Sequence, residues 1–190
     1  MKERIIAEAR QLFNHLGVKT VRLEDIAQQL GISKKTVYQH FDSKEELVRL
    51  MLETQLNENL REANAIHKQV ADPIASALLI WDRLSHYRRT VNPNLLRDIE
   101  RHYPTVWHLF QSFRTEYINT ILIANLHEGI EQGLYRTDLD ETVIAWLWAD
   151  QSQRETPYDH SDVAIKHHFV RGLLTQKGLY LYEAIKSRDE

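Results

Sequence analysis

Apolar residues recur along this chain at spacings of three and four, which is the period of an α-helix, and no convincing stretch alternates at the period of a strand. A first amphipathic helix is predicted over residues 2–15, followed by Gly17, a residue type that commonly terminates helices. Its apolar stripe consists of Ile5, Ile6, Ala9, Leu12, Phe13 and Leu16. Two short helices are predicted next, over residues 23–30 and 34–40, with Ser33 placed as the N-cap of the second.

A fourth helix is predicted to begin near Ser43 and to run into the rest of the chain. Ser43 and Glu46 have the spacing of a capping box, in which both side chains accept hydrogen bonds from backbone N–H groups at the helix start. Asp138 and Glu141 repeat this spacing. Further helices are predicted over residues 73–89, 94–103, 104–130, 139–151 and, after a polar loop around Pro157, 162–185. We therefore expect an all-α fold of eight or nine helices.

The segment from residue 23 to residue 41, LEDIAQQLGISKKTVYQHF, has the pattern of a helix-turn-helix. Ala27 supplies a small residue where the two helices cross, and Gly31 supplies a residue that tolerates positive φ in the turn. The apolar residues that would hold the two helices at a steep angle are Ile26, Leu30, Ile32 and Val37. This combination predicts a DNA-binding module whose second helix enters the major groove.

A denser set of motif positions extends from residue 5 to residue 47. These positions are Ala9, Leu12, Phe13, Gly17, Asp25, Ile26, Ala27, Gly31, Ile32, Ser33, Tyr38, Phe41, Ser43, Lys44 and Leu47. In them the chain resembles the N-terminal domain of TetR-type transcriptional regulators, and the segment EGIEQGLYRTD at 128–138 resembles the turn before their last two helices. The resemblance implies a homodimer, paired through the last two helices, that binds double-stranded operator DNA. The chain departs from the family pattern at Arg22, where a Ser or Thr usually caps the second helix and touches phosphate.

The recognition helix can be divided by face. Val37 and Phe41 lie four residues apart and are expected to face the core, so the opposite face is expected to meet DNA. The candidates for base edges, which can donate to purines or contact a thymine methyl, are Lys35, Thr36 and Gln39. The candidates for phosphate contacts are Lys34, Tyr38, His40, Lys44, the cation Arg22 and the backbone amides near Ser33.

We expect two domains, a helix-turn-helix DNA-binding domain at residues 1–46 and a helical effector-binding and dimerisation domain at residues 47–190. Aromatic residues at helical spacing are candidates for a pocket that binds a small apolar or aromatic effector, although the same spacing is common in plain core. They are Trp81, Tyr103, Trp107, Phe110, Phe113 and Tyr117. The helices around Trp146 and Phe169 carry more apolar surface than one buried face needs, which favours a dimer interface over a single large core.

Composition narrows the classes of function. The chain of 190 residues has no cysteine, which excludes disulfides, zinc–cysteine sites and cysteine nucleophiles. The net charge is −3, yet residues 1–50 hold nine Lys or Arg against seven Asp or Glu, and this excess has the sign that a DNA-facing end requires. The ten histidines form no recognisable metal site and no catalytic motif or cofactor loop is found, so we expect no metal, no cofactor and no enzyme activity.

No apolar run approaches the ~18 residues of a membrane span, so we expect a cytoplasmic protein without membrane contact. Two other functions stay open at this point. The first is a dimeric helical protein-interaction module that retains the scaffold without specific DNA binding. The second is an enzyme that uses the aromatic cavity, although no pair of titratable residues is found to serve it. Steep salt dependence of DNA affinity would separate a DNA-binding regulator from both.

Overall fold

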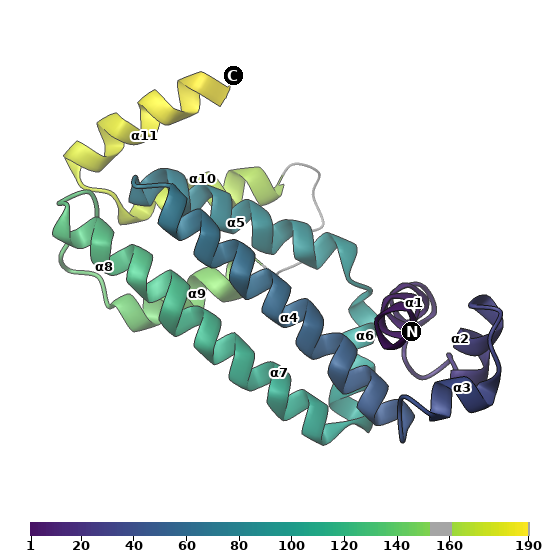
Figure 1. The fold of residues 1–190 in the computed structure, drawn as a ribbon. Helices are drawn as coiled ribbons and strands as arrows, with labels where there is room; N and C mark the ends of the chain where they lie inside the picture. Colours follow the sequence, from purple (N-terminus) through teal and green to yellow (C-terminus); the bar gives the residue numbers. More distant parts are fainter. Residues whose placement is uncertain (153–160, 190) are drawn as a thin grey trace. The chain divides into compact units, whose positions relative to one another are not determined.

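The computed structural model describes residues 1–152 and 161–189, and every regular element within these ranges is a helix (Figure 1), which confirms the all-α fold class. The loop expected around Pro157 lies outside the described residues. The elements are α1 (Lys2–Leu16), α2 (Leu23–Gln29), α3 (Lys34–Tyr38), α4 (Lys44–Gln69), α5 (Pro73–Thr90), α6 (Pro93–His102), α7 (Pro104–Tyr117), the π-helical turn η1 (Ile118–Leu122), α8 (Ile123–Glu131), α9 (Glu141–Gln151), α10 (Ser161–Leu173) and α11 (Gln176–Asp189).

The chain divides into two compact units, each of which is described separately. Unit 1 contains residues 1–59 and 88–114, and unit 2 contains residues 60–87 and 115–190. The domain boundary expected after residue 46 stays a prediction, because units of packing and domains of function need not end at the same residue.

Unit 1 is built around the helix-turn-helix. Gly17 ends α1 as predicted, with a φ of 82° and an N–H that donates to the Phe13 carbonyl. The buried side chains of α1, α2 and α3 share one core with side chains from α4, α6 and α7. Arg10 adds a polar tie between α1 and α4, because its Nη1 donates to Gln55 Oε1 at 2.9 Å and lies 3.3 Å from Glu58 Oε2. The helix-turn-helix is therefore stabilised by packing against helices that lie well beyond residue 46 in the sequence.

Unit 2 has a core centred on large aromatic side chains. Trp81 and Trp148 are buried, and the ring of Phe169 lies 5.2 Å from that of Trp81. A group of buried hydrogen bonds connects the start of α5 to α8 and to the turn after α8. There the Pro73 carbonyl accepts from Asn125 Nδ2 at 2.9 Å and from the Tyr135 hydroxyl at 3.0 Å. These hydrogen bonds give a structural reason for Tyr135 in the segment 128–138.

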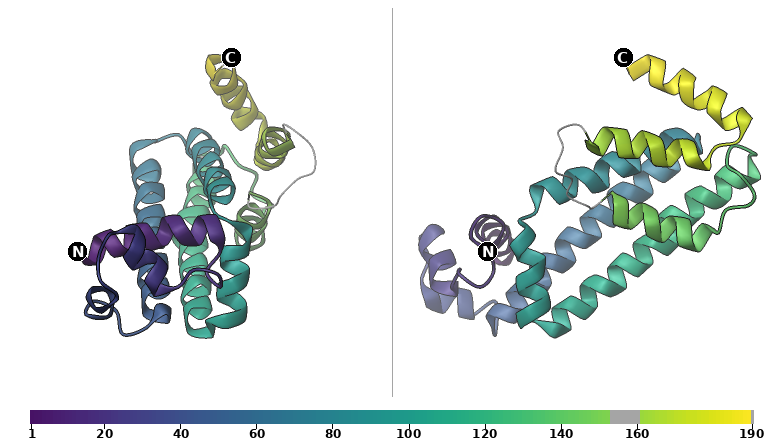
Figure 2. Two further views of the ribbon diagram at one scale, coloured as in Figure 1. Left: turned by 90° about the vertical axis from the view of Figure 1, so that its right-hand side faces the viewer. Right: turned by 180° about the vertical axis from the view of Figure 1, so that it is seen from behind.

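The structure corrects the prediction of a single last helix over residues 162–185. The chain breaks after α10, where Leu174 forms an isolated bridge with Tyr135, and Thr175 then caps α11 by accepting from the Gly178 N–H at 3.1 Å. A Cβ on Gly178 would lie 2.2 Å from the Leu134 carbonyl oxygen, so this close approach requires glycine. Figure 2 shows α11 as a separate helix projecting from the end of α10.

Three smaller predictions also change. The helix expected over 104–130 is interrupted by η1, a turn with one more residue than an α-helical turn. The cap of α9 is Asp140, which accepts from the Val143 N–H at 3.0 Å, whereas Asp138 pairs with Arg136. Finally, α3 ends at Tyr38, two residues before the predicted end of the helix.

Candidate nucleic-acid interface

The turn between α2 and α3 has the geometry that the sequence predicts. Gly31 has a φ of 63°, a conformation that most other residues adopt at a cost, and the N–H of Ile32 donates back to the Ala27 carbonyl at 3.0 Å. Ser33 caps α3, since its Oγ accepts from the Thr36 N–H at 3.1 Å. The Thr36 hydroxyl is 2.9 Å from the same oxygen. The first turn of α3 is therefore fixed before any ligand binds.

The faces of α3 are divided as predicted. Val37 and Phe41 are fully buried in the core of unit 1. On the other side, the described side chains of the predicted base and phosphate candidates reach solvent: Lys34, Lys35, Tyr38 and Gln39 are exposed, and Thr36 and His40 are partly exposed. The structure thus brings these candidates onto one accessible surface.

One ion pair on this surface was not predicted. The Lys34 ammonium is bound to the Glu24 carboxylate of α2, and it also lies 5.5 Å from the centre of the Tyr38 ring. The hydrogen bond from Lys34 holds the pKa of Glu24 below its usual value, and the same bond raises the pKa of Lys34. The residue types alone carried no signal for the pair, because the two residues are ten positions apart and meet only through the turn.

Lys44 lies differently from the other cations. Its ammonium donates to the Val18 carbonyl and lies 5.9 Å from the centre of the Phe13 ring, and burial lowers its pKa. The side chain therefore fastens the start of α4 to the end of α1. The helix start itself is capped by Ser43, whose Oγ accepts from the Glu46 N–H at 3.1 Å, while the Glu46 carboxylate accepts from the backbone one residue earlier than a standard capping box requires.

Arg22 occupies the N-cap position of α2 with an extended backbone, and its side chain is exposed. Its N–H donates to the Asp25 carboxylate at 2.7 Å, which is half of a capping box. Lys2 is a further cation in this region that the sequence analysis did not predict. Its ammonium lies 5.6 Å from the centre of the ring of Phe41, just beyond α3. Cations from α1, α2 and α3 thus gather around the recognition helix.

Residues 5–51 match the family described as bacterial regulatory proteins of the tetR family. The N-terminal part of this chain is therefore a helix-turn-helix domain of the TetR type. Across 98% of its length it is 28% identical to the HTH-type transcriptional regulator YfiR of Bacillus subtilis, of which it covers 92%. Over 57 residues, 30% of the chain and 31% of the relative, it is 39% identical to IcaR, a negative transcriptional regulator of the biofilm operon icaADBC in Staphylococcus epidermidis. A solved transcriptional regulator from Saccharomonospora viridis in complex with choline has a TM-score of 0.75 and 20% identity, with 92% of this chain and 98% of that chain covered.

The six aromatic effector candidates of this chain fall into two groups. Tyr103, Trp107 and Phe110 pack in the core of unit 1, where the rings of Trp107 and Phe110 stack with centres 5.2 Å apart, and Phe113 lies in the same unit. Trp81 and Tyr117 belong to unit 2. The role of the six as a pocket lining stays a prediction.

Tyr117 differs from the other five because its hydroxyl group is buried without a hydrogen-bond partner, and burial raises its pKa. The hydroxyl lies at the end of α7, directly before η1. Buried polar atoms that lack partners are uncommon in proteins, so the Tyr117 hydroxyl requires a structural or functional reason.

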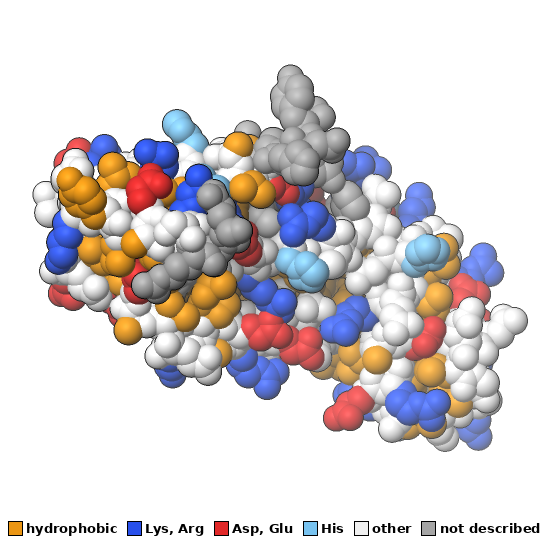
Figure 3. Space-filling view, turned by 90° about the horizontal axis from the view of Figure 1, so that it is seen from above, with side chains coloured by type: hydrophobic (Ala, Val, Ile, Leu, Met, Phe, Trp, Pro, Cys, Tyr) orange, Lys and Arg blue, Asp and Glu red, His pale blue; other side chains and the backbone are white. Residues whose placement is uncertain are grey.

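The C-terminal helices of the chain present apolar side chains to solvent. Val143 and Trp146 in α9 are 51% and 50% exposed, and Val163 in α10 is 52% exposed. Figure 3 shows hydrophobic side chains at the surface of unit 2, toward the left of the view. An exposed tryptophan beside exposed valines is typical of a surface that a partner covers.

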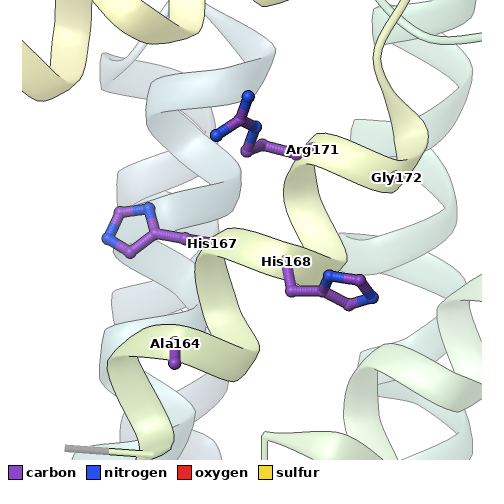
Figure 4. Close-up of a pocket in the computed structure, with 5 residues that line it drawn as sticks. All are labelled: Ala164, His167, His168, Arg171 and Gly172. Carbon is purple, nitrogen blue, oxygen red and sulfur yellow. The ribbon is translucent and has the colours of Figure 1, made fainter.

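An open cavity of about 500 Å³ lies on the outer side of α10 (Figure 4). It is lined by Ala164, His167, His168, Arg171 and Gly172. His167 Nδ1 is hydrogen-bonded to the Tyr182 hydroxyl of α11 at 2.6 Å. Burial and the neighbouring cations, chiefly Lys166, lower the pKa of His167, so its neutral form is favoured here.

No group of three or more His, Asp or Glu residues among the described residues is arranged to hold a metal ion. In the same part of the chain, no helix combines the length and the apolar content that crossing a membrane requires.

Proposed function

We propose that this TetR-type regulator is a ligand-responsive repressor that binds a palindromic operator as a homodimer. The observation that carries the proposal is the division of the segment 34–41, in which Val37 of α3 and Phe41 just beyond it are buried and a polar, cationic face is directed outward. One recognition helix covers too few base pairs for specificity, so two copies reading symmetric half-sites are required. The negative regulation carried out by IcaR supports repression rather than activation.

Within the operator complex we assign two kinds of contact. Lys35, Thr36 and Gln39 contact base edges, which carry the sequence information. The phosphate contacts come from Arg22, Lys34, Tyr38, His40, Lys44 and the backbone near Ser33, and they fix the register without reading sequence. Of these, Lys44 already donates to the Val18 carbonyl, which leaves two of its three N–H donors for a phosphate.

The homodimer is proposed to form through the two helices predicted last, which correspond to α9 and to α10 with α11, and a second copy would bury their exposed apolar side chains. An isologous interface buries the same patch on both subunits, so Trp146 is covered twice in one dimer. Replacing it with serine should shift the equilibrium toward monomer in sedimentation velocity, whereas Leu79→Ser in α5, a change at an apolar residue that is 46% exposed outside these helices, is the matched control. Equal dimer constants for both variants would contradict this interface.

Residues 1–46 are proposed to bind DNA, and residues 47–190 to bind the effector and the second subunit. A small apolar effector with a hydrogen-bond acceptor suits the region around Tyr117, because the buried hydroxyl there lacks a partner. The choline bound to the Saccharomonospora viridis regulator supports a small-molecule ligand in this fold. Effector binding would then favour a state in which the two α3 helices no longer match successive major grooves.

The proposal is tested by selecting duplexes from random DNA with the purified chain and measuring affinity against salt. Each phosphate contact should contribute a slope of about −0.9, so several contacts give a steep dependence. Lys35→Ala should change which sequences are preferred, while Tyr38→Phe should weaken all duplexes alike. A chain that binds no duplex at low salt would refute the proposal and favour the protein-interaction module instead.

A further inference from the structure

Glu24 is a carboxylate on a surface that the proposed function assigns to DNA, and the inference below rests on that function. It lies in the first turn of α2, and its carboxylate binds the ammonium of Lys34 in the first turn of α3. The two side chains are 46% and 56% exposed, so the pair is open to solvent and to any ligand that approaches α3. The neighbouring Asp25 has a different task, because its carboxylate accepts from the Arg22 N–H.

A carboxylate and a DNA phosphate are ligands of the same kind for an ammonium group. Each is an anion with oxygen acceptors, and each forms charge-assisted hydrogen bonds to lysine. In the free protein Glu24 already holds the place that a phosphate would take next to Lys34. Binding of DNA to Lys34 therefore exchanges one anionic partner for another, or else brings a phosphate close to the Glu24 carboxylate.

The exchange has a consequence for salt dependence. A lysine that neutralises a phosphate contributes to DNA affinity mainly by releasing counterions from the duplex. When the lysine has first to give up a carboxylate, that carboxylate must recruit a cation of its own, and most of the gain is cancelled. We propose that Glu24 is an intramolecular competitor of DNA phosphate for Lys34, and that it lowers the sequence-independent part of operator affinity.

The competition explains why a strong cation can stand at the first position of a recognition helix without making the protein bind every duplex tightly. Non-operator sites in a genome outnumber the operator by several orders of magnitude, so a lower phosphate affinity limits the share of protein held on them. Lys35, which follows Lys34 in the sequence, is not paired with a carboxylate among the residues that the structure describes and remains the cation for base edges.

The test uses Glu24→Gln, which removes the charge and keeps the size of the side chain. Fluorescence anisotropy with a selected operator and with a scrambled duplex should show that the variant binds both more tightly, by roughly tenfold at low salt for a dimer. The salt slope should steepen by about two, one phosphate for each subunit. The order of preference among operator variants should not change.

Lys34→Ala supplies the decisive background. In that background Glu24→Gln should change affinity by less than about twofold, since the competitor has lost the group it competes for. Glu100→Gln, at an exposed position in α6, changes the net charge equally and should leave the slope as it is. Thermal melting of each variant checks that the fold is retained.

The outcomes separate cleanly. An unchanged affinity in Glu24→Gln overturns the inference alone, provided that the unmodified chain binds DNA. A gain that persists in the Lys34→Ala background overturns it too, because bulk charge would then be the cause. A loss of affinity restricted to particular base pairs would show that Glu24 reads a base. Failure of the unmodified chain to bind any duplex overturns the proposed function and this inference together.

Discussion

Arg22 offers a prediction in which fold stability and DNA binding move in opposite directions. It occupies the N-cap of α2 with φ −101° and ψ 161°, the extended shape that N-cap residues adopt. A guanidinium group has only donors, so it cannot accept a hydrogen bond from the first turn of the helix. Asp25 already accepts from the Arg22 N–H, and a serine at position 22 would complete the capping box.

Arg22→Ser should therefore raise the free energy of unfolding by about 1 kcal/mol, the usual contribution of an N-cap. With an m-value of about 2 kcal/mol/M in urea, the unfolding midpoint should rise by about 0.5 M. The same change removes a proposed cationic phosphate contact from each subunit, and a neutral serine hydroxyl does not neutralise a phosphate in its place. The affinity of the dimer should then depend less on salt. Between 50 and 200 mM salt, the factor by which the affinity falls should be about 12 times smaller than for the unmodified chain.

Urea unfolding followed by circular dichroism and anisotropy with operator DNA measure the two effects separately. Arg22→Ala is the matched control, because it loses the same cation without gaining an acceptor. Serine and alanine variants that unfold at the same urea concentration would refute the capping argument. An unchanged salt slope in both would refute the assignment of Arg22 to phosphate.

Three further predictions concern unit 2. Gly178→Ala should lower the free energy of unfolding by about 1–3 kcal/mol, because the new Cβ would meet the Leu134 carbonyl, and equal urea midpoints would contradict it. Tyr135→Phe should lower the free energy of unfolding by about 1 kcal/mol, because it removes the donor to the Pro73 carbonyl, and an unchanged urea midpoint would contradict this expectation. The pKa of His167 is lowered from 6.5 in the folded chain, so the folded state disfavours the imidazolium and stability should fall as the pH drops through that value. His167→Gln should reduce this fall between about pH 7.5 and 5.5, and identical pH profiles would contradict the assignment.

The sequence allowed most of the helix-turn-helix to be predicted because its determinants are local. Gly31 is needed for a turn that closes within a few residues, and the helical spacing of Val37 and Phe41 predicts the buried side of the segment 34–41, although α3 itself ends at Tyr38. By contrast, the ion pair of Glu24 with Lys34 depends on how two helices cross, and no periodicity encodes that distance.

The missed break between α10 and α11 has the same origin. The apolar spacing continues through residue 174, so local pattern favours one helix. The break is imposed by partners remote in sequence, because the Thr175 N–H donates to the Leu134 carbonyl and Gly178 lies against the same group. Asp140 was overlooked in favour of Asp138 for a simpler reason, since both lie within two residues of a suitable helix start and periodicity does not resolve such small offsets.

The π-helical turn η1 amounts to a one-residue insertion absorbed inside a long helix. Each residue of an α-helix advances the side chains by roughly 100°, so everything after Leu122 is rotated by that amount relative to an uninterrupted continuation of α7. Asn125 and Leu126 are buried in this rotated frame, and Asn125 reaches the Pro73 carbonyl there. A shorter version of the chain, lacking one residue between 118 and 122, would wind as a regular α-helix and still direct the same side of α8 toward its neighbours, whereas regular winding at full length would turn α8 by roughly 100°.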